Sequence, residues 1–241
     1  MAKKRTKSPF IITIDGPAGS GKTTTAKALS RELGFVYVDT GAMYRAIALA
    51  AKQREISLDD VHSICEMVGK VDLAIRRNGE SQETLLDGKN VEHIIRTSEI
   101  SMGASKVSAI PCVREAMVEM QREVGYESDG AILEGRDIGT VVFPDAPCKV
   151  YLVADVRTRA VRRQKQLAES GTSVELETLE REIAERDQND MTREHSPLRK
   201  PDDAIEVETT NTTIDEQVSM ILSLVKNRHK RYESECNERN N

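Results

Sequence analysis

Short apolar runs alternate with helical patterns in the first part of the chain. FIITID, residues 10–15, is rich in β-branched side chains and is followed by glycine, which predicts a buried parallel strand. A helix is expected over residues 21–33, ended by a glycine. VYVD, residues 36–39, predicts a second strand, and TGAMYRAIALAAK, residues 40–52, a second helix with Thr40 near its N-cap. This alternation is typical of a βαβ unit.

The rhythm changes in the middle of the chain. VDLAIRR, ETLLD and KNV are short strand-like pieces, separated by turn signals at Asn78-Gly79 and Asp87-Gly88. They predict a small antiparallel meander over about residues 71–92, inserted between helices. A surface hairpin with no role is the alternative, and the pattern does not exclude it.

Helices and buried strands then resume. Two apolar runs, AILEG and KVYLVAD, predict strands, and AIEVET predicts a final one. Five short parallel strands with crossover helices make a doubly wound sheet, whose ligands bind at its carboxyl edge. The other helices are expected over residues 97–109, 111–124, two segments of 156–194 separated near Gly171, and 214–230, followed by a frayed polar tail.

DGPAGSGKTTT, residues 15–25, matches the phosphate-binding loop pattern between the first strand and the first helix. Its glycines let backbone N–H groups close around phosphates, and the helix N-terminus favours anions. Lys22 is expected to reach the β- and γ-phosphates, and the Thr23 hydroxyl to ligate Mg²⁺. The expected ATP-binding residues are Gly16, Pro17, Ala18, Gly19, Ser20, Gly21, Lys22, Thr23 and Thr24.

Composition narrows the class of protein. The chain has 241 residues, 38% hydrophobic and 31% charged, which is typical of a globular α/β domain. No apolar run approaches the roughly 20 residues of a membrane span, and MAKKRTKSPF lacks the apolar core of a secretory signal, so we expect a cytoplasmic protein. A net charge of −5 and 3% aromatic residues argue against a nucleic-acid binder.

The cysteines and histidines carry no metal or redox spacing. No Cys-x-x-Cys pair occurs, so Cys65, Cys112, Cys148 and Cys236 are expected to be free thiols in a reducing cytosol. The four histidines form no metal-ligand pattern either.

Several protein classes use a phosphate-binding loop. A GTPase switch also needs an Asp-x-x-Gly and an Asn-Lys-x-Asp stretch, and neither occurs here. A nucleic-acid motor normally has a larger core, and the acidic balance opposes it. A small-molecule kinase instead needs a second anion site, rich in arginine, for its acceptor. Two strand ends supply one: Arg45 follows the strand that ends at Asp39, and Arg136 follows the strand that ends at Glu134.

The second charged helix adds more. Leu176, Leu179 and Ile183 form an apolar seam, and continuing its spacing gives Arg186, Asp190 and Arg193. Charge on the inner line of a helix favours a polar cleft. An (i, i+4) ladder of Glu182, Arg186 and Asp190 on a fraying helix end is the alternative.

DVRTRAVRRQ opens the first charged helix with four arginines, Arg157, Arg159, Arg162 and Arg163. A solvated basic face is the common explanation of such a run. A lid that brings arginines onto the transferring phosphoryl group is the functional explanation, and the second anion site favours it.

ITIDGPAGSGKTT, VDTGAMYR, VSAIPCVREAM, EGRDIGTVVFPDA and ERDQND together resemble bacterial-type cytidylate kinases over about residues 10–225. The resemblance implies a P-loop nucleoside monophosphate kinase fold, with a five-stranded parallel sheet, an acceptor-binding insert containing a small antiparallel sheet, and an Arg-rich lid. It implies transfer of the γ-phosphoryl group of ATP to CMP or dCMP with Mg²⁺. UMP or another small anion as acceptor, and an ATP-binding regulatory module, remain the alternatives.

Residue by residue, the resemblance gives the acceptor phosphate to Arg45, Arg136 and Arg193. It gives the sugar hydroxyls to Arg186 and Asp190, and the cytosine to Ser105, Arg114 and Asp137 with Thr40 nearby. The catalytic set it implies is Lys22, Arg136, Arg159, Arg163 and Arg193. One departure is visible, because Glu134 stands where many members have Asp.

The resemblance also implies a division of the chain and a set of partners. ATP, CMP and dCMP are the expected partners, with no nucleic acid, no membrane and a monomeric state. The expected parts are a core of residues 9–39, 111–155 and 172–230, an acceptor-binding domain of 40–110, a lid of 156–171, and flexible tails of 1–8 and 231–241.

Overall fold

A computed structural model describes residues 9–78, 81–169 and 171–239 and contains two sheets. The larger is parallel throughout, in the order β2-β6-β1-β7-β8. It confirms the doubly wound sheet expected from the sequence. Its strands are β1 (Phe10–Asp15), β2 (Val36–Asp39), β6 (Gly130–Gly135), β7 (Cys148–Val153) and β8 (Ile205–Glu208).

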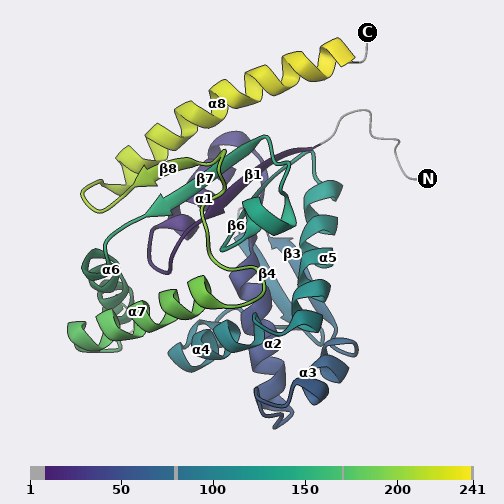
Figure 1. The fold of residues 1–241 in the computed structure, drawn as a ribbon, viewed down its shortest axis with the longest axis vertical. Coiled ribbons are helices and arrows are strands. Elements are labelled where there is room, and N and C mark those ends of the chain that lie inside the picture. Colours follow the sequence, from purple (N-terminus) through teal and green to yellow (C-terminus); the bar gives the residue numbers. More distant parts are fainter. Residues whose placement is uncertain (1–8, 79–80, 170, 240–241) are drawn as a thin grey trace.

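Helices cover both faces of this sheet (Figure 1). On one face α1 (Lys22–Leu33) and α8 (Ile214–Arg239) pack against the strands, with Leu29 and Val225 fully buried. On the other lies α5 (Pro111–Glu127). Because both faces are covered there, the inner strands β1 and β6 are buried at every position, whereas the edge strand β8 alternates apolar and acidic residues.

A second core lies beside the sheet. Alanine-rich α2 is buried along most of its length and packs against the other helices of this part and against the smaller, antiparallel sheet, whose order is β3-β4-β5. This sheet confirms the predicted meander. The elements are α2 (Thr40–Gln53), α3 (Val61–Val68), β3 (Leu73–Asn78), β4 (Ser81–Leu86), β5 (Lys89–Asn90), a 3₁₀ turn (Ile94–Arg96) and α4 (Ser98–Val107).

The long charged stretch forms two helices, α6 (Val156–Glu169) and α7 (Leu176–Thr192), which lie against each other (Figure 1). Leu179 and Ile183 of the predicted seam are buried and pack on Ala160. The two predicted helical segments are therefore confirmed, and their apolar seam is a small core of its own. No helix in the described part of the chain has the length and apolarity to cross a membrane.

The predicted end of the last helix is wrong. α8 continues beyond residue 230 to Arg239, so residues 231–239 are helical rather than a frayed tail. Tyr232 and His229 pack edge-on against Phe10 of β1, with ring centroids 5.2 and 4.6 Å away. These contacts stabilise a turn of helix whose sequence alone is polar. The tail prediction for residues 1–8 and 240–241 lies outside the described residues.

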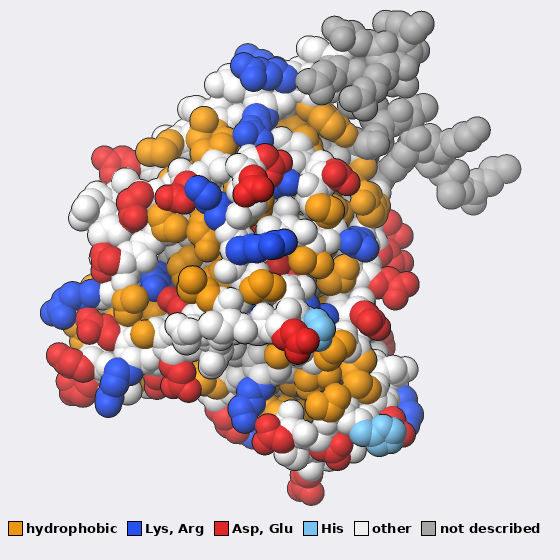
Figure 2. All heavy atoms as spheres, in the orientation of Figure 1, with side chains coloured by type: hydrophobic (Ala, Val, Ile, Leu, Met, Phe, Trp, Pro, Cys, Tyr) orange, Lys and Arg blue, Asp and Glu red, His pale blue; other side chains and the backbone are white. Residues whose placement is uncertain are grey.

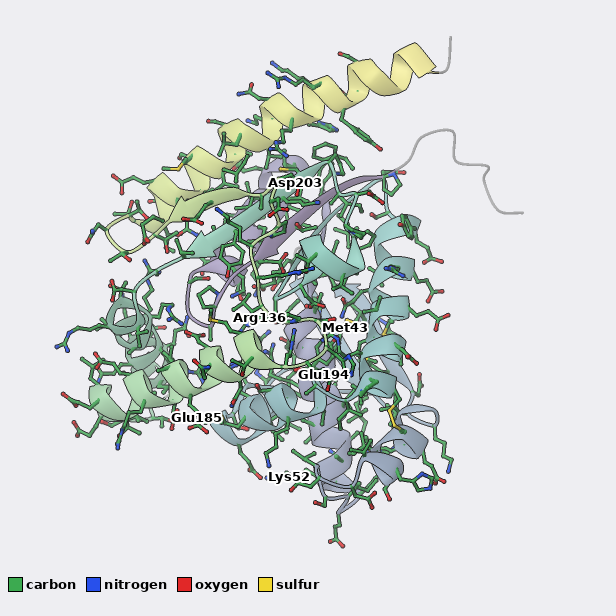
Figure 3. The ribbon with its side chains drawn as sticks, in the orientation of Figure 1. Met43, Lys52, Arg136, Glu185, Glu194 and Asp203 are labelled. Carbon is green, nitrogen blue, oxygen red and sulfur yellow. A yellow bond between two sulfur atoms is a disulfide. The ribbon has the colours of Figure 1, made fainter. Side chains whose placement is uncertain are left out.

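The prediction of free thiols is wrong for two cysteines. Cys65 of α3 and Cys112 of α5 form a disulfide, visible between the two helices in Figure 3. They are 47 residues apart in sequence, so only the packing of α3 against α5 brings them together. Cys148 is a buried free thiol, as expected. The side chain of Cys236 lies outside the described residues.

Removing this disulfide is expected to destabilise the chain. Cys65→Ser with Cys112→Ser frees a long loop in the unfolded state, so the free energy of unfolding falls by about 2–4 kcal/mol. Urea unfolding measures the difference, and reductant should lower the stability of the wild type to that of the double variant. Equal stability of the oxidised wild type and the variant would contradict a structural role for the bond.

Candidate active site

The phosphate-binding loop connects β1 to α1 and turns through left-handed glycines. Gly16, Gly19 and Gly21 have φ values of 147°, 76° and 92°. Gly16 also lies against β7, where a Cβ atom would be 2.2 Å from the carbonyl oxygen of Leu152. A larger residue could adopt neither the torsion nor the close approach. The glycines thus shape the loop that opens on the N-terminus of α1.

Lys22 begins α1 and is only 7% exposed. Its Nζ donates to the carbonyl oxygen of Pro17 at 2.6 Å, which bends the side chain over the loop. Burial and the nearby Arg136 guanidinium lower the pKa of Lys22, and the Glu134 carboxylate acts against them. An anion in the loop would raise that pKa and stabilise the charged ammonium.

The Glu134 carboxylate lies between two hydroxyl groups. Its Oε2 accepts from the Thr23 hydroxyl at 3.0 Å, and its Oε1 accepts from the Tyr37 hydroxyl at 2.5 Å. Burial and the Asp39 carboxylate raise the pKa of Glu134, while Lys22 and the two hydroxyls lower it. Both carboxylate oxygens of Glu134, which stands where many related sequences have Asp, therefore accept a hydrogen bond.

The oxygens of Thr23 and Glu134 suit Mg²⁺, which prefers one or two protein oxygens together with substrate phosphates. Among the residues that the structure describes, no three His, Cys, Asp or Glu side chains form a metal cluster. A cation at this position would therefore depend on nucleotide oxygens for the rest of its coordination.

A cavity opens beside the loop and receives side chains from both cores. Most of the predicted site residues line this cavity. In Figure 3, Arg136 lies between the strands and α7, and it lines the cavity. The predicted residues that line the cavity are Ala18, Gly19, Lys22, Thr23, Thr40, Arg45, Ser105, Arg114, Arg136, Asp137, Arg163, Arg186, Asp190 and Arg193.

Carboxylates hold the arginines that the resemblance assigns to the acceptor phosphate. Arg45 Nη2 lies 2.8 Å from Asp39 Oδ2, and Arg136 Nε lies 2.7 Å from Asp190 Oδ2. Arg193 instead donates to backbone and hydroxyl oxygens, at Ser196 and Ser108. Each guanidinium is thereby oriented while leaving further N–H groups for a ligand.

Three arginine nitrogens around the cavity are buried with no hydrogen-bond partner in the described part of the chain: Nε of Arg45, Nε of Arg186 and Nη2 of Arg193. Burial and the neighbouring Arg136 lower the pKa of Arg186 to about 10. Such a crowding of cations is unfavourable without anions nearby. The cavity therefore has the electrostatics of a site for an anionic molecule.

The residues assigned to cytosine form a donor beside an acceptor. Arg114, 5% exposed, pairs with the Asp137 carboxylate and donates to the carbonyl oxygen of Ser108 at 3.1 Å. The Ser105 hydroxyl donates to Asp190 Oδ1 at 3.4 Å. Thr40 donates to the backbone carbonyl of Glu134 at 2.7 Å.

The charged end of the α7 seam faces the cavity. Asp190 is 3% exposed and reaches across to Arg136 on the loop after β6. This contact crosses between elements, so the cleft interpretation is confirmed over the ladder on a fraying helix.

The arginines of α6 divide into two pairs. Arg159 is buried against the phosphate-binding loop, where its Nη1 donates to the Ala18 carbonyl at 3.0 Å and its Nη2 lies 2.6 Å from Asp187. Arg163 lines the cavity, and burial and the Arg45 charge lower its pKa. The other two face away from it, toward Glu180 and Thr209 respectively: Arg157 and Arg162.

Sequence reasoning missed the centre of the arginine network. Asp39 caps α2 by accepting the Ala42 N–H at 2.9 Å and also pairs with Arg96 at 3.1 Å, besides Arg45. Burial alone would raise the pKa of Asp39, but the two arginines hold it below its ordinary value. An aspartate just before a helix is a capping signal, whereas nothing near Arg96 in sequence marked it.

Comparison with known proteins shows the family of the chain. The family model for cytidylate kinase matches residues 12–227. A cytidylate kinase of Lactobacillus gasseri is 43% identical over 230 residues, which cover 95% of this chain and all of that protein. Another, of Chloroherpeton thalassium, is 46% identical over 223 residues, covering 89% of this chain and 92% of that protein. The chain belongs to the cytidylate kinase family.

Proposed function

We propose that this protein transfers the γ-phosphoryl group of ATP to CMP and dCMP, giving CDP and dCDP. The observation that carries the proposal is the single cavity in which a phosphate-binding loop meets an arginine cluster. The Arg114–Asp137 ion pair also lines this cavity. Release of ADP with a panel of monophosphates, in the presence of ATP and Mg²⁺, tests it. CMP and dCMP are expected to be the best acceptors, and release that no monophosphate stimulates would contradict the proposal.

The nucleotides bind at opposite ends of the cavity. ATP places its phosphates on residues 16–24, with Lys22 at the β- and γ-phosphates. The acceptor phosphate takes the free N–H groups of Arg45, Arg136 and Arg193. In this arrangement the sugar hydroxyls meet Arg186 and Asp190, and the base meets the residues Ser105, Arg114 and Asp137.

The chain's own residues then promote in-line transfer. A phosphate oxygen of CMP bonds to the γ-phosphorus while the bond to the ADP oxygen breaks, and no general base is required because the acceptor is already an anion. Lys22, Arg159 and Arg163 stabilise the charge on the transferring group. Thr23 and Glu134 would hold Mg²⁺, which would supply positive charge to offset the charge of the donor phosphates.

Closure of two parts around the nucleotides excludes water from the transfer. Residues 40–110 are the acceptor-binding domain and residues 156–171 the lid, both moving against the core of 9–39, 111–155 and 172–230. We also propose a monomer that binds no nucleic acid; Figure 2 shows acidic and basic side chains interspersed on one face rather than a continuous basic surface. We also assign the enzyme to the cytoplasm.

Replacing Lys22 is expected to abolish most turnover. Lys22→Ala removes the cation over the phosphates, so kcat falls by ~10²-fold or more, with the fold intact by circular dichroism. Lys52→Ala is the matched control, since Lys52 is exposed at the far end of α2 (Figure 3). Near-normal kcat in the Lys22 variant would contradict the phosphate-binding role.

Acceptor and lid arginines are expected to differ kinetically. Arg193→Ala removes a contact made in ground and transition states, so KM for CMP rises by ~10-fold or more, as it does for Arg45 and Arg136. Arg159→Ala mainly lowers kcat. Arg157→Ala, on the same helix but exposed, leaves both constants unchanged. Initial-rate kinetics with CMP measure these effects, and an unchanged KM in the Arg193 variant would remove it from the acceptor site.

Base selectivity is expected to depend on Arg114. The cytosine amine donates where uracil accepts, and cytosine N3 accepts where uracil donates, so a neighbouring donor and acceptor favour cytosine. CMP is expected to exceed UMP by ~10²-fold in kcat/KM, and Arg114→Met to lower the CMP value far more than the UMP value. Equal losses would mean that Arg114 is only structural.

A further inference from the structure

Asp15, the last residue of β1, connects the donor side of the cavity to the acceptor side. Its side chain is 1% exposed. Its Oδ1 accepts the backbone N–H of Ile138 at 2.9 Å, and its Oδ2 accepts that of Gly139 at 2.8 Å. These two amides directly follow Arg136 and Asp137 in the chain. One carboxylate therefore anchors the loop that carries two proposed ligands of CMP.

The anchor holds the loop at an unusually close approach. Ile138–Val142 forms a short π-helical turn, whose first N–H groups have no partner within the turn itself. At Gly139 a Cβ atom would lie 2.8 Å from Thr13 Oγ1 and 3.3 Å from Asp15 Oδ2. Two hydrogen bonds at successive amides fix both the position and the rotation of this backbone. A change at Asp15 would therefore displace the adjacent Asp137 and Arg136.

The other polar contacts of the loop come from side chains of helices. One is Arg122 of α5, which donates to the carbonyl oxygens of Val141 and Val142. Arg136 pairs with Asp190 on α7, and Asp137 pairs with Arg114 on α5. Both partners are side chains that can follow a displaced loop, whereas β1 is the central strand of the sheet. The loop begins at the end of β6, and Asp15 gives it a second connection to the rigid sheet, through β1.

The charge on Asp15 depends on its surroundings. The pKa of Asp15 is raised to about 6, chiefly by burial and to a smaller extent by the Asp137 carboxylate. The two backbone N–H groups and the Lys22 ammonium lower it in part. Tyr151, its neighbour on β7, has a pKa raised by burial and by Asp15. The carboxylate is therefore ionised at neutral pH and protonated below about pH 6, where its acceptor capacity falls.

We propose that Asp15 is a positioning residue for the acceptor: its carboxylate fixes the loop of Arg136 and Asp137 and so sets the affinity for the acceptor monophosphate without touching either nucleotide. This inference rests on the proposed function, because it takes Arg136 and Asp137 as acceptor ligands. The proposed role of Asp15 differs from that of the phosphate-binding loop, although Asp15 directly precedes the loop in sequence.

The first test is kinetic. Asp15→Asn keeps the size of the side chain but puts an amide donor against one backbone N–H, so KM for CMP is expected to rise by ~10-fold or more while KM for ATP changes by less than about 3-fold. Thr13→Val is the matched control, since the Thr13 hydroxyl has no hydrogen-bond partner in the described chain, and it should leave both constants unchanged. Equal rises in the two KM values, or an unchanged KM for CMP, would overturn the proposal.

The second test uses NMR and needs no substrate. In amide NMR spectra of the ligand-free wild type, the resonances of Ile138 and Gly139 are expected to titrate with a midpoint near pH 6. They should titrate likewise in Thr13→Val and not in Asp15→Asn. If the Ile138 and Gly139 amides had the same chemical shifts and the same pH response in Asp15→Asn as in the wild type, the anchor would be refuted even if CMP is phosphorylated. If the titration is present but CMP is not a substrate, the proposed function fails and the anchor stands.

Discussion

The structure has to keep many arginines around one cavity. Cations in such a space repel one another, and burial makes the repulsion stronger. The chain counters this with carboxylates that each hold an arginine: Asp39 holds Arg45 and Arg96, and Asp190 holds Arg136. Each pair keeps its guanidinium both charged and oriented. A nucleotide phosphate that enters the cavity then meets cations whose geometry is already set, so little ordering is left for binding to supply.

The parallel sheet explains how these side chains meet. All strands of a parallel sheet end at one edge, and here the strand order places β6 between β2 and β1. Asp39 is in register with Glu134, and Asp15 with Gly135. The residues that follow these three strands carry the phosphate-binding loop, the start of α2 and the Arg136 loop. Segments about 100 residues apart in sequence thus form one site because of strand order, not because of local structure.

This also explains what the sequence could and could not predict. The phosphate-binding loop and the α7 seam are encoded locally, by glycine spacing and by helical periodicity, and both predictions are confirmed. The Cys65–Cys112 disulfide, the Arg96–Asp39 pair and the contact of Tyr232 with Phe10 join elements far apart in the chain. From the sequence alone, the cysteines are expected to be free thiols and the last residues a polar tail, and nothing marks Arg96. Only the packing of the helices gives these residues their partners.

Glu134 shows how a single methylene fits into this arrangement. It ends β6, with Thr23 on one side and Tyr37 of the neighbouring strand β2 on the other. The longer side chain reaches both hydroxyls at once, and two O–H donors offset part of the burial that raises its pKa. Glutamate at this position is therefore matched to the tyrosine on β2. Glu134, beside the phosphate-binding loop, is held by hydroxyl groups of the sheet and of α1, and the acceptor loop is held by Asp15 of β1. The strands of the central sheet therefore set the positions of both.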